Sequence, residues 1–68
     1  LGYQKVTLEN QKLKIKTKPE ITFEINEIQG EVITRKHNLS FDYGEKTYNF
    51  LLKDPMIILN AITYIKEN

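Results

Sequence analysis

Apolar and polar residues alternate with a period of two over most of this chain, from Gln4 to Leu52. Successive side chains of a β-strand point to opposite faces, so this alternation is typical of strands with one buried and one exposed face. Such strands pair in antiparallel sheets that have water on one side. The pattern therefore predicts a mainly β chain, with room for a helix only after residue 54.

The length of the chain, 68 residues, allows one small domain, which we take as residues 1–68. A chain of this size buries only about 60% of the surface that its unfolded form exposes. It contains no cysteine, so neither disulfides nor thiolate metal sites can supplement the core, and apolar packing must suffice. The first residue is Leu1 rather than methionine, which suggests a processed or excised piece of a longer protein.

Two short strands are expected at the beginning of the chain. Val6 and Leu8 share one face of the first, and Leu13 and Ile15 share one face of the second. The polar corner Glu9-Asn10-Gln11 joins them. We expect a hairpin whose outer face carries lysines.

A third and a fourth strand follow Pro19, which ends the second strand because proline has no N–H to donate to a strand ladder. The alternation over residues 21–25 predicts the third strand. Residues 27–30 are expected to form a connection in which Ile28 drops into the core. The fourth strand then covers residues 32–36.

The last two strands form the clearest hairpin of the sequence. A tight turn at His37-Asn38 is expected to precede the fifth strand, over residues 39–43. Gly44-Glu45 fits a two-residue type II′ loop, because glycine takes the position that needs a positive φ. This loop places Tyr43 opposite Lys46 at the start of the sixth strand.

The hydrophobic period changes near Asp54, which can cap the free amides of a helix, and Pro55 suits the first helical position. Isoleucines then recur at helical spacing, which predicts a helix over residues 55–66. The expected fold class is mainly β (α+β): a small antiparallel meander or partly open barrel of five or six strands, closed by one C-terminal helix. The predicted core comprises Val6, Leu13, Ile15, Ile21, Phe23, Ile25, Leu39, Phe41, Tyr48, Phe50, Ile58, Ile62 and Ile65.

Three features in this order resemble PH-like and GRAM-like domains: the segment from Ile21 to Ile28, the Tyr48-Asn49-Phe50 strand and the helix that starts at Asp54-Pro55. The resemblance covers most of the chain. It implies a β-rich scaffold with a helix at one end of the barrel, which binds lipid head groups or protein partners and is not a catalyst. Phosphoinositide-binding members carry clustered basic residues in the loop after the first strand, where this chain has Glu9-Asn10-Gln11.

Lys12, Lys14 and Lys16 recur every second residue and are expected to project from one face. They are the candidate contact for an anionic surface, at about 1 kcal/mol per lysine for a membrane. The alternative is that they protect an exposed strand from aggregation. The chain has a formal charge of +1, but residues 1–18 carry a net charge of +4 and residues 19–34 a net charge of −4. This segregation predicts a polar axis, unless the glutamates fold beside the lysines.

No catalytic, cofactor-binding or metal-binding residues are predicted. His37 is the only histidine and is interpreted as a turn residue. Ser40 and Asp42 flank Phe41 without an oriented base or oxyanion-stabilising groups in view. The glutamates of the acidic segment are interpreted as a solvated rim. The three glycines stand singly, so there is no phosphate-binding loop.

Three functional hypotheses follow. The first is a non-catalytic PH-like binding or regulatory module of a larger bacterial protein, which contacts a protein partner or an anionic membrane surface. The second is a small nucleic-acid-binding β-barrel that uses Lys12, Lys14 and Lys16. The third is a non-catalytic fragment of a larger enzyme. No apolar run approaches the roughly 20 residues of a transmembrane helix, and the lack of cysteine favours a reducing compartment such as the cytoplasm. The ligand, the partner and the oligomeric state are not predicted.

Overall fold

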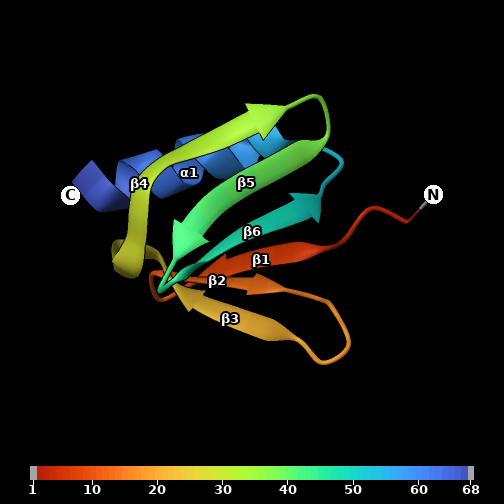
Figure 1. Ribbon diagram of the computed structural model, residues 1–68, viewed down its shortest axis with the longest axis horizontal. Coiled ribbons are helices and arrows are strands. Elements are labelled where there is room, and N and C mark those ends of the chain that lie inside the picture. The colour runs from red at the N-terminus through yellow and green to blue at the C-terminus, as the bar shows by residue number, and fades with distance from the viewer. Residues whose placement is uncertain (1, 68) are drawn as a thin grey trace.

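The computed structural model describes residues 2–67, and six strands, a short 3-10 helix and a C-terminal α-helix follow one another along them (Figure 1). The mainly β fold with one C-terminal helix is therefore confirmed. The elements are β1 (Val6–Glu9), β2 (Lys12–Ile15), β3 (Ile21–Glu24), η1 (Ile25–Glu27), β4 (Ile28–Arg35), β5 (Asn38–Tyr43), β6 (Lys46–Leu51) and α1 (Pro55–Glu67).

The strands form two antiparallel sheets of three, in the orders β1-β2-β3 and β4-β5-β6. The sheets meet where β1 lies beside β6 (Figure 1), and the Gln4 N–H donates a hydrogen bond of 2.8 Å to the Leu51 carbonyl oxygen there. The sheets do not close into a barrel. The meander is therefore the form that the structure takes.

Two hairpin turns follow from local backbone preferences. Asn10 and Gln11 have φ angles of 52° and 62°, and Glu9 pairs with Lys12. Positive φ at both central residues is the requirement of a type I′ turn, which matches the twist of the strands. In the second hairpin Tyr43 pairs with Lys46, as predicted, around Gly44 with a φ of 65°.

The turn predicted at His37-Asn38 lies one residue earlier in the structure, so its predicted position is wrong. The two turn residues are Lys36, with a φ of 57°, and His37, and Arg35 pairs with Asn38 across them. Asn38 belongs to β5, where it pairs with Arg35 and Leu51, and its side-chain Nδ2 also donates to Asn49 Oδ1 on β6 at 3.2 Å. A cross-strand partner for the asparagine side chain thus favours the strand over the turn.

Ile28 is buried in the core, as predicted, but the connection predicted at residues 27–30 is wrong. β3 ends at Glu24, the 3-10 helix η1 makes the turn, and β4 already begins at Ile28, which pairs with Tyr43. Gly30, with a φ of 66°, lies in the register shift between Gln29 and Ile33. The glycine therefore serves a bulge within a strand, where a residue with positive φ is needed, rather than a loop between strands.

All thirteen predicted core residues are buried or pack against the buried cluster. Phe23 from β3 is 1% exposed and is surrounded by aromatic rings of the other sheet. Ile28 and Leu52 complete the core. The two sheets therefore share a single apolar interior.

The helix α1 begins at Pro55, as predicted, and ends one residue beyond the predicted range. It packs against η1, β4 and β5, with Ile62 1% exposed (Figure 1). Near its last turn, Lys66 Nζ donates a hydrogen bond of 2.6 Å to the Ile28 carbonyl oxygen. The helix covers the apolar side of the second sheet and is attached to the start of β4.

Candidate functional site

The lysines predicted as a surface contact lie on and just beyond β2, the central strand of the first sheet. Leu13 and Ile15 are fully buried, so Lys12 and Lys14 point to the opposite, outer face of the sheet. Lys16 follows the last residue of the strand. The structure therefore places Lys12 and Lys14 on one face of the sheet, as predicted, whereas Lys16 lies beyond the end of the strand.

Each of these lysines has a glutamate beside it. The Nζ–carboxylate distances are 3.7 Å for Lys12–Glu24, 3.6 Å for Lys14–Glu9 and 2.9 Å for Lys16–Glu20. Lys12 and Glu24 face each other because β2 pairs with β3 in that register. Opposite charges at such distances largely cancel each other's external field, so this surface is charge-balanced.

The pairing with lysine changes the pKa of Glu20. The hydrogen bond that Lys16 Nζ donates to Glu20 Oε1 lowers the pKa of that carboxyl below its usual value. Desolvation opposes the lowering, and the positive charges of Lys16 and Lys14 add to it. The glutamate is thus held in its ionised form by the lysine that it neutralises.

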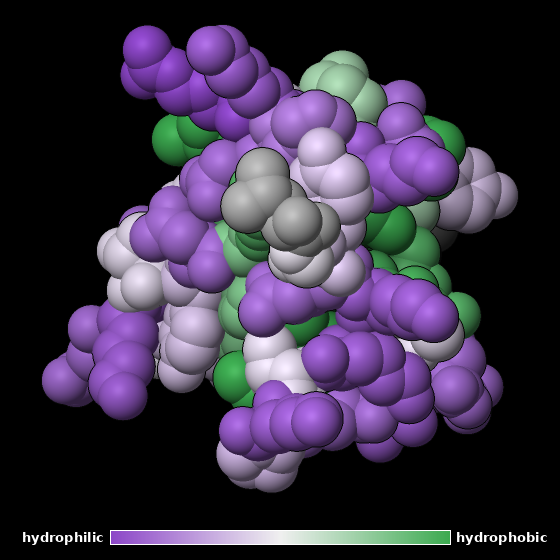
Figure 2. Space-filling model, turned by 90° about the vertical axis from the view of Figure 1, so that its right-hand side faces the viewer, coloured by the Kyte–Doolittle hydropathy of each residue, from purple (hydrophilic) through white to green (hydrophobic). Residues whose placement is uncertain are grey.

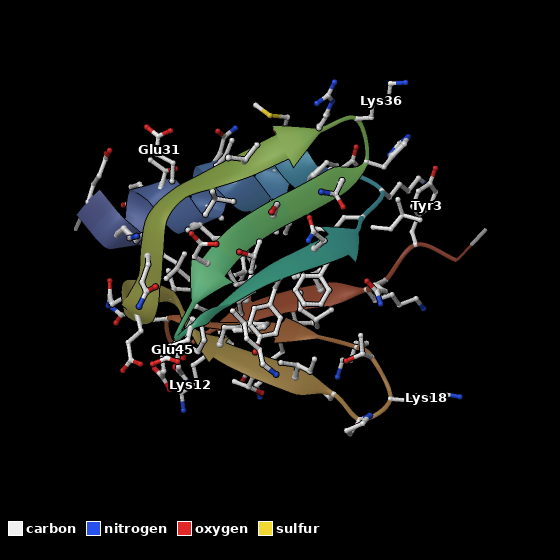
Figure 3. All side chains as sticks on the ribbon, in the orientation of Figure 1. Tyr3, Lys12, Lys18, Glu31, Lys36 and Glu45 are labelled. Carbon is white, nitrogen blue, oxygen red and sulfur yellow. The ribbon has the colours of Figure 1, made fainter. Side chains whose placement is uncertain are left out.

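A second group of bases lies at one end of the molecule. In an up-and-down meander every second connection returns to the same end of the molecule. This end therefore holds the segments 2–5, 16–20, 36–37 and 52–54. Figure 3 shows two of these bases, Lys18 and Lys36, at the same end as Tyr3. We call this the basic end. Its bases are Lys5, Lys16, Lys18, Lys36 and Lys53, together with Arg35 at the end of β4, and its acids are Glu20 and Asp54.

The bases of this end are mostly without acidic partners. Within residues 2–67, the only bases that form ion pairs with acidic side chains are Lys12, Lys14 and Lys16. Lys16 is therefore the one paired base of the basic end. Acids predominate at the opposite end, where Figure 3 shows Glu31 and Glu45. The polar axis expected from the two charge blocks is therefore absent, because glutamates fold beside Lys12, Lys14 and Lys16. A different charge separation runs along the strands, from the basic end to the opposite end.

A groove of about 540 Å³ opens at the basic end, between the segment that leads into β1 and the first turn of α1. Tyr3 is 42% exposed and Ile57 is 63% exposed. Figure 2 views this end directly and shows hydrophobic surface gathered on the helix side, between polar regions. The groove is lined by Tyr3, Gln4, Lys5, Val6, Thr7, Lys16, Leu52, Lys53, Asp54, Ile57 and Ile58.

His37 holds together two connections at the basic end. Its Nδ1 lies 3.2 Å from the Leu52 carbonyl oxygen and 3.1 Å from that of Lys53, and its ring centroid is 4.9 Å from that of Tyr3. Both carbonyl oxygens accept hydrogen bonds, so Nδ1 carries the proton in this arrangement. The histidine is a turn residue, as predicted, and it fixes the segment that leads into α1.

Of the residues considered for catalysis, Asp42 has a hydrogen-bonded carboxylate and Ser40 lies in the middle of a strand ladder. Asp42 accepts a hydrogen bond of 2.6 Å from Thr47 Oγ1, and Ser40 pairs with Asn49 on β6. Among residues 2–67 no three His, Cys, Asp or Glu side chains lie close enough together to hold a metal ion. In the same part of the chain no helix combines the length and the apolar character needed to cross a bilayer.

No protein-family model, curated protein or solved structure matches this chain. The resemblance to PH-like domains thus rests on the residues quoted for it. The basic end and its groove are the features that reasoning from the sequence missed. The signal for them was the order of the hairpins, which returns Lys18, Lys36 and Lys53 to one end of the meander.

Proposed function

We propose that the domain is a non-catalytic binding module of PH-like architecture that contacts an anionic membrane surface through its basic end. The observation that carries the proposal is that one end of the molecule combines bases without acidic partners, among them Lys5 and Lys53, with the exposed side chain of Ile57. Anionic lipids attract such bases, while apolar side chains enter the boundary between head groups and acyl chains. The domain would therefore dock end-on, with its strands directed away from the membrane.

The composition of the basic end favours a membrane over a nucleic acid. Readers of single strands stack bases on several exposed aromatic rings, whereas the groove at this end has the aliphatic Ile57 beside one aromatic ring, that of Tyr3. The lysine face proposed as a nucleic-acid contact is balanced by glutamates. The first feature weighs against the stacking of bases and the second against a phosphate contact by the lysine face.

The test is the binding of the chain to phosphatidylcholine vesicles with and without phosphatidylserine, at low and moderate salt. A triple variant with Lys18→Gln, Lys36→Gln and Lys53→Gln removes bases from the basic end. We expect its affinity for the anionic vesicles to fall about a hundredfold, from about 1 kcal/mol for each lysine. Added salt should weaken the binding of the wild type.

The matched control carries Lys12→Gln, Lys14→Gln and Lys46→Gln, which change the net charge by the same amount away from the basic end. It should bind like the wild type. Equal losses in the two variants, or no binding by the wild type at low salt, would overturn the proposal. Tight binding to single-stranded nucleic acid without vesicle binding would do the same and favour the second hypothesis.

A further inference from the structure

We infer that the groove at the basic end is a binding site for a monomeric anionic amphiphile with a single alkyl chain, such as a medium-chain carboxylate. The inference rests on the proposed function in that both use the basic end. It goes further by assigning a site and a class of small ligand to it. Three properties of the groove support it: the apolar wall, the charges on its rim and the occupied backbone groups around it.

The wall of the groove is formed by side chains from three separate segments. Val6 and Ile58 are half-buried members of the layer that packs against the core, and Leu52 is buried. Ile57 extends this wall outward. The result is a continuous apolar strip that reaches from the core to the solvent. A volume of about 540 Å³ lies within the range of small-molecule sites.

The rim of the groove carries more positive than negative charge. Lys5, Lys16 and Lys53 line it, and Asp54 is the acid among its lining residues. Lys16 is paired with Glu20, which leaves Lys5 and Lys53 to meet a head group. A carboxylate at the rim and a hydrocarbon chain along the wall would satisfy both parts of the site.

Backbone groups around the groove are already paired, which favours an alkyl chain over a peptide. The amide of Gln4 donates to Leu51, that of Lys16 donates to Lys5 at 2.9 Å, and that of Leu52 donates at 2.7 Å to the turn between β4 and β5. A peptide in the groove would find these donors occupied and would lose hydrogen bonds to water without replacement. A hydrocarbon chain requires no such partners.

The test is a titration of the chain with octanoate and decanoate below their micelle concentrations. Calorimetry measures the affinity, and amide chemical shifts in NMR spectra locate the residues that respond. We expect one saturable site, with shifts confined to residues 3–7, 16 and 52–58. The two additional methylenes of decanoate should raise the affinity on the order of tenfold. An alkyltrimethylammonium of equal chain length should bind much more weakly, because its charge opposes that of the rim.

Two isoleucines provide a matched pair of variants. Ile57 is 63% exposed in the groove wall, and Ile33 is 61% exposed on β4, outside the groove. Ile57→Ser should weaken decanoate binding at least severalfold, whereas Ile33→Ser should leave it unchanged. Because both side chains are exposed, both variants should fold, and the amide spectrum of each checks this.

The outcomes separate this inference from the proposed function. Vesicle binding without decanoate binding would overturn the inference and leave the proposed function standing. Decanoate binding at the predicted residues without vesicle binding would support the inference and overturn the proposed function. Equal binding of the carboxylate and the ammonium compound, or equal loss in the two serine variants, would overturn the inference.

Discussion

The Phe23 ring meets the Phe41 ring edge-on, with the centroids 4.9 Å apart and the planes at 89°. Phe23 belongs to β3 and Phe41 to β5, so the contact joins the two sheets. An edge-to-face arrangement is the favourable geometry for aromatic pairs. Tyr43, Tyr48 and Phe50 surround the same Phe23 ring from β5 and β6. One side chain of the first sheet thus contacts four aromatic rings of the second.

Replacement of Phe23 by leucine should therefore weaken the attachment of one sheet to the other. Phe23→Leu keeps an apolar side chain but removes the edge-to-face contacts, and we expect a loss of about 1 to 3 kcal/mol in the free energy of unfolding. Urea denaturation followed by circular dichroism measures it. Tyr3→Leu, at a partly exposed ring outside this cluster, is the control and should change the stability by less than about 0.5 kcal/mol.

The Tyr43 hydroxyl makes a second link between the sheets, because its Oη accepts a hydrogen bond of 3.0 Å from the Glu24 N–H. Glu24 is the last residue of β3, an edge strand. Tyr43→Phe should cost about 0.5 to 1.5 kcal/mol of stability, the usual net value of one hydrogen bond. It should also accelerate hydrogen exchange at the Glu24 amide. Unchanged exchange at this amide would contradict the assignment of the bond.

The helix should depend on Ile62 more than on any exposed residue of its own surface. A helix of 13 residues is marginal alone in water, so packing must hold it in place. Ile62→Ala removes a buried side chain and should cost about 2 to 5 kcal/mol. Ile57→Ala, on the same helix but exposed, should change the stability by less than about 0.5 kcal/mol in a urea titration. Similar losses in both variants would contradict the role of α1 as a cover.

The Lys16–Glu20 pair should make the stability of the fold depend on pH. Because the hydrogen bond from Lys16 lowers the pKa of Glu20 in the folded state, ionised Glu20 stabilises the fold. This contribution is fully present above the usual glutamate pKa of about 4.3 and is lost as the pH falls through the lowered folded value. In a carboxyl NMR titration, Lys16→Gln should raise the midpoint of Glu20 towards its usual value. Lys46→Gln, which removes the same charge elsewhere, should leave that midpoint unchanged.

Local chemistry accounts for the features that the sequence predicted well. Alternation assigns the buried face of each strand, and Gly44 and Pro55 have backbone preferences that mark a turn and a helix start. The 3-10 turn at Ile25–Glu27 was missed because Ile25 continues the alternation of β3 and is buried in either conformation. The turn lies at Lys36 and His37 because Asn38 pairs with Arg35 and Leu51, and this register cannot be predicted from the residues of the turn alone.

The candidate site was harder to predict, because it depends on pairing between distant segments. Counting charges along the chain assigns Lys12 and Glu24 to opposite blocks, whereas the pairing of β2 with β3 places them face to face. The groove requires residues near Val6 and Ile57 to meet, and their separation in sequence hides this. The location of the groove can be inferred only when the direction of α1 relative to the two sheets is known.

The meander that brings three connections and the segment before β1 to the basic end also has a consequence for engineering. Those segments, residues 2–5, 16–20, 36–37 and 52–54, come from separate parts of the chain, yet they lie at the same end of the molecule, where Figure 3 shows Tyr3, Lys18 and Lys36. Randomising the exposed positions of these segments, with His37 and the buried Leu52 kept, would alter that end while leaving the paired strands and the aromatic interior in place. This cysteine-free domain is therefore a compact starting point for selecting new recognition proteins that have to work under reducing conditions.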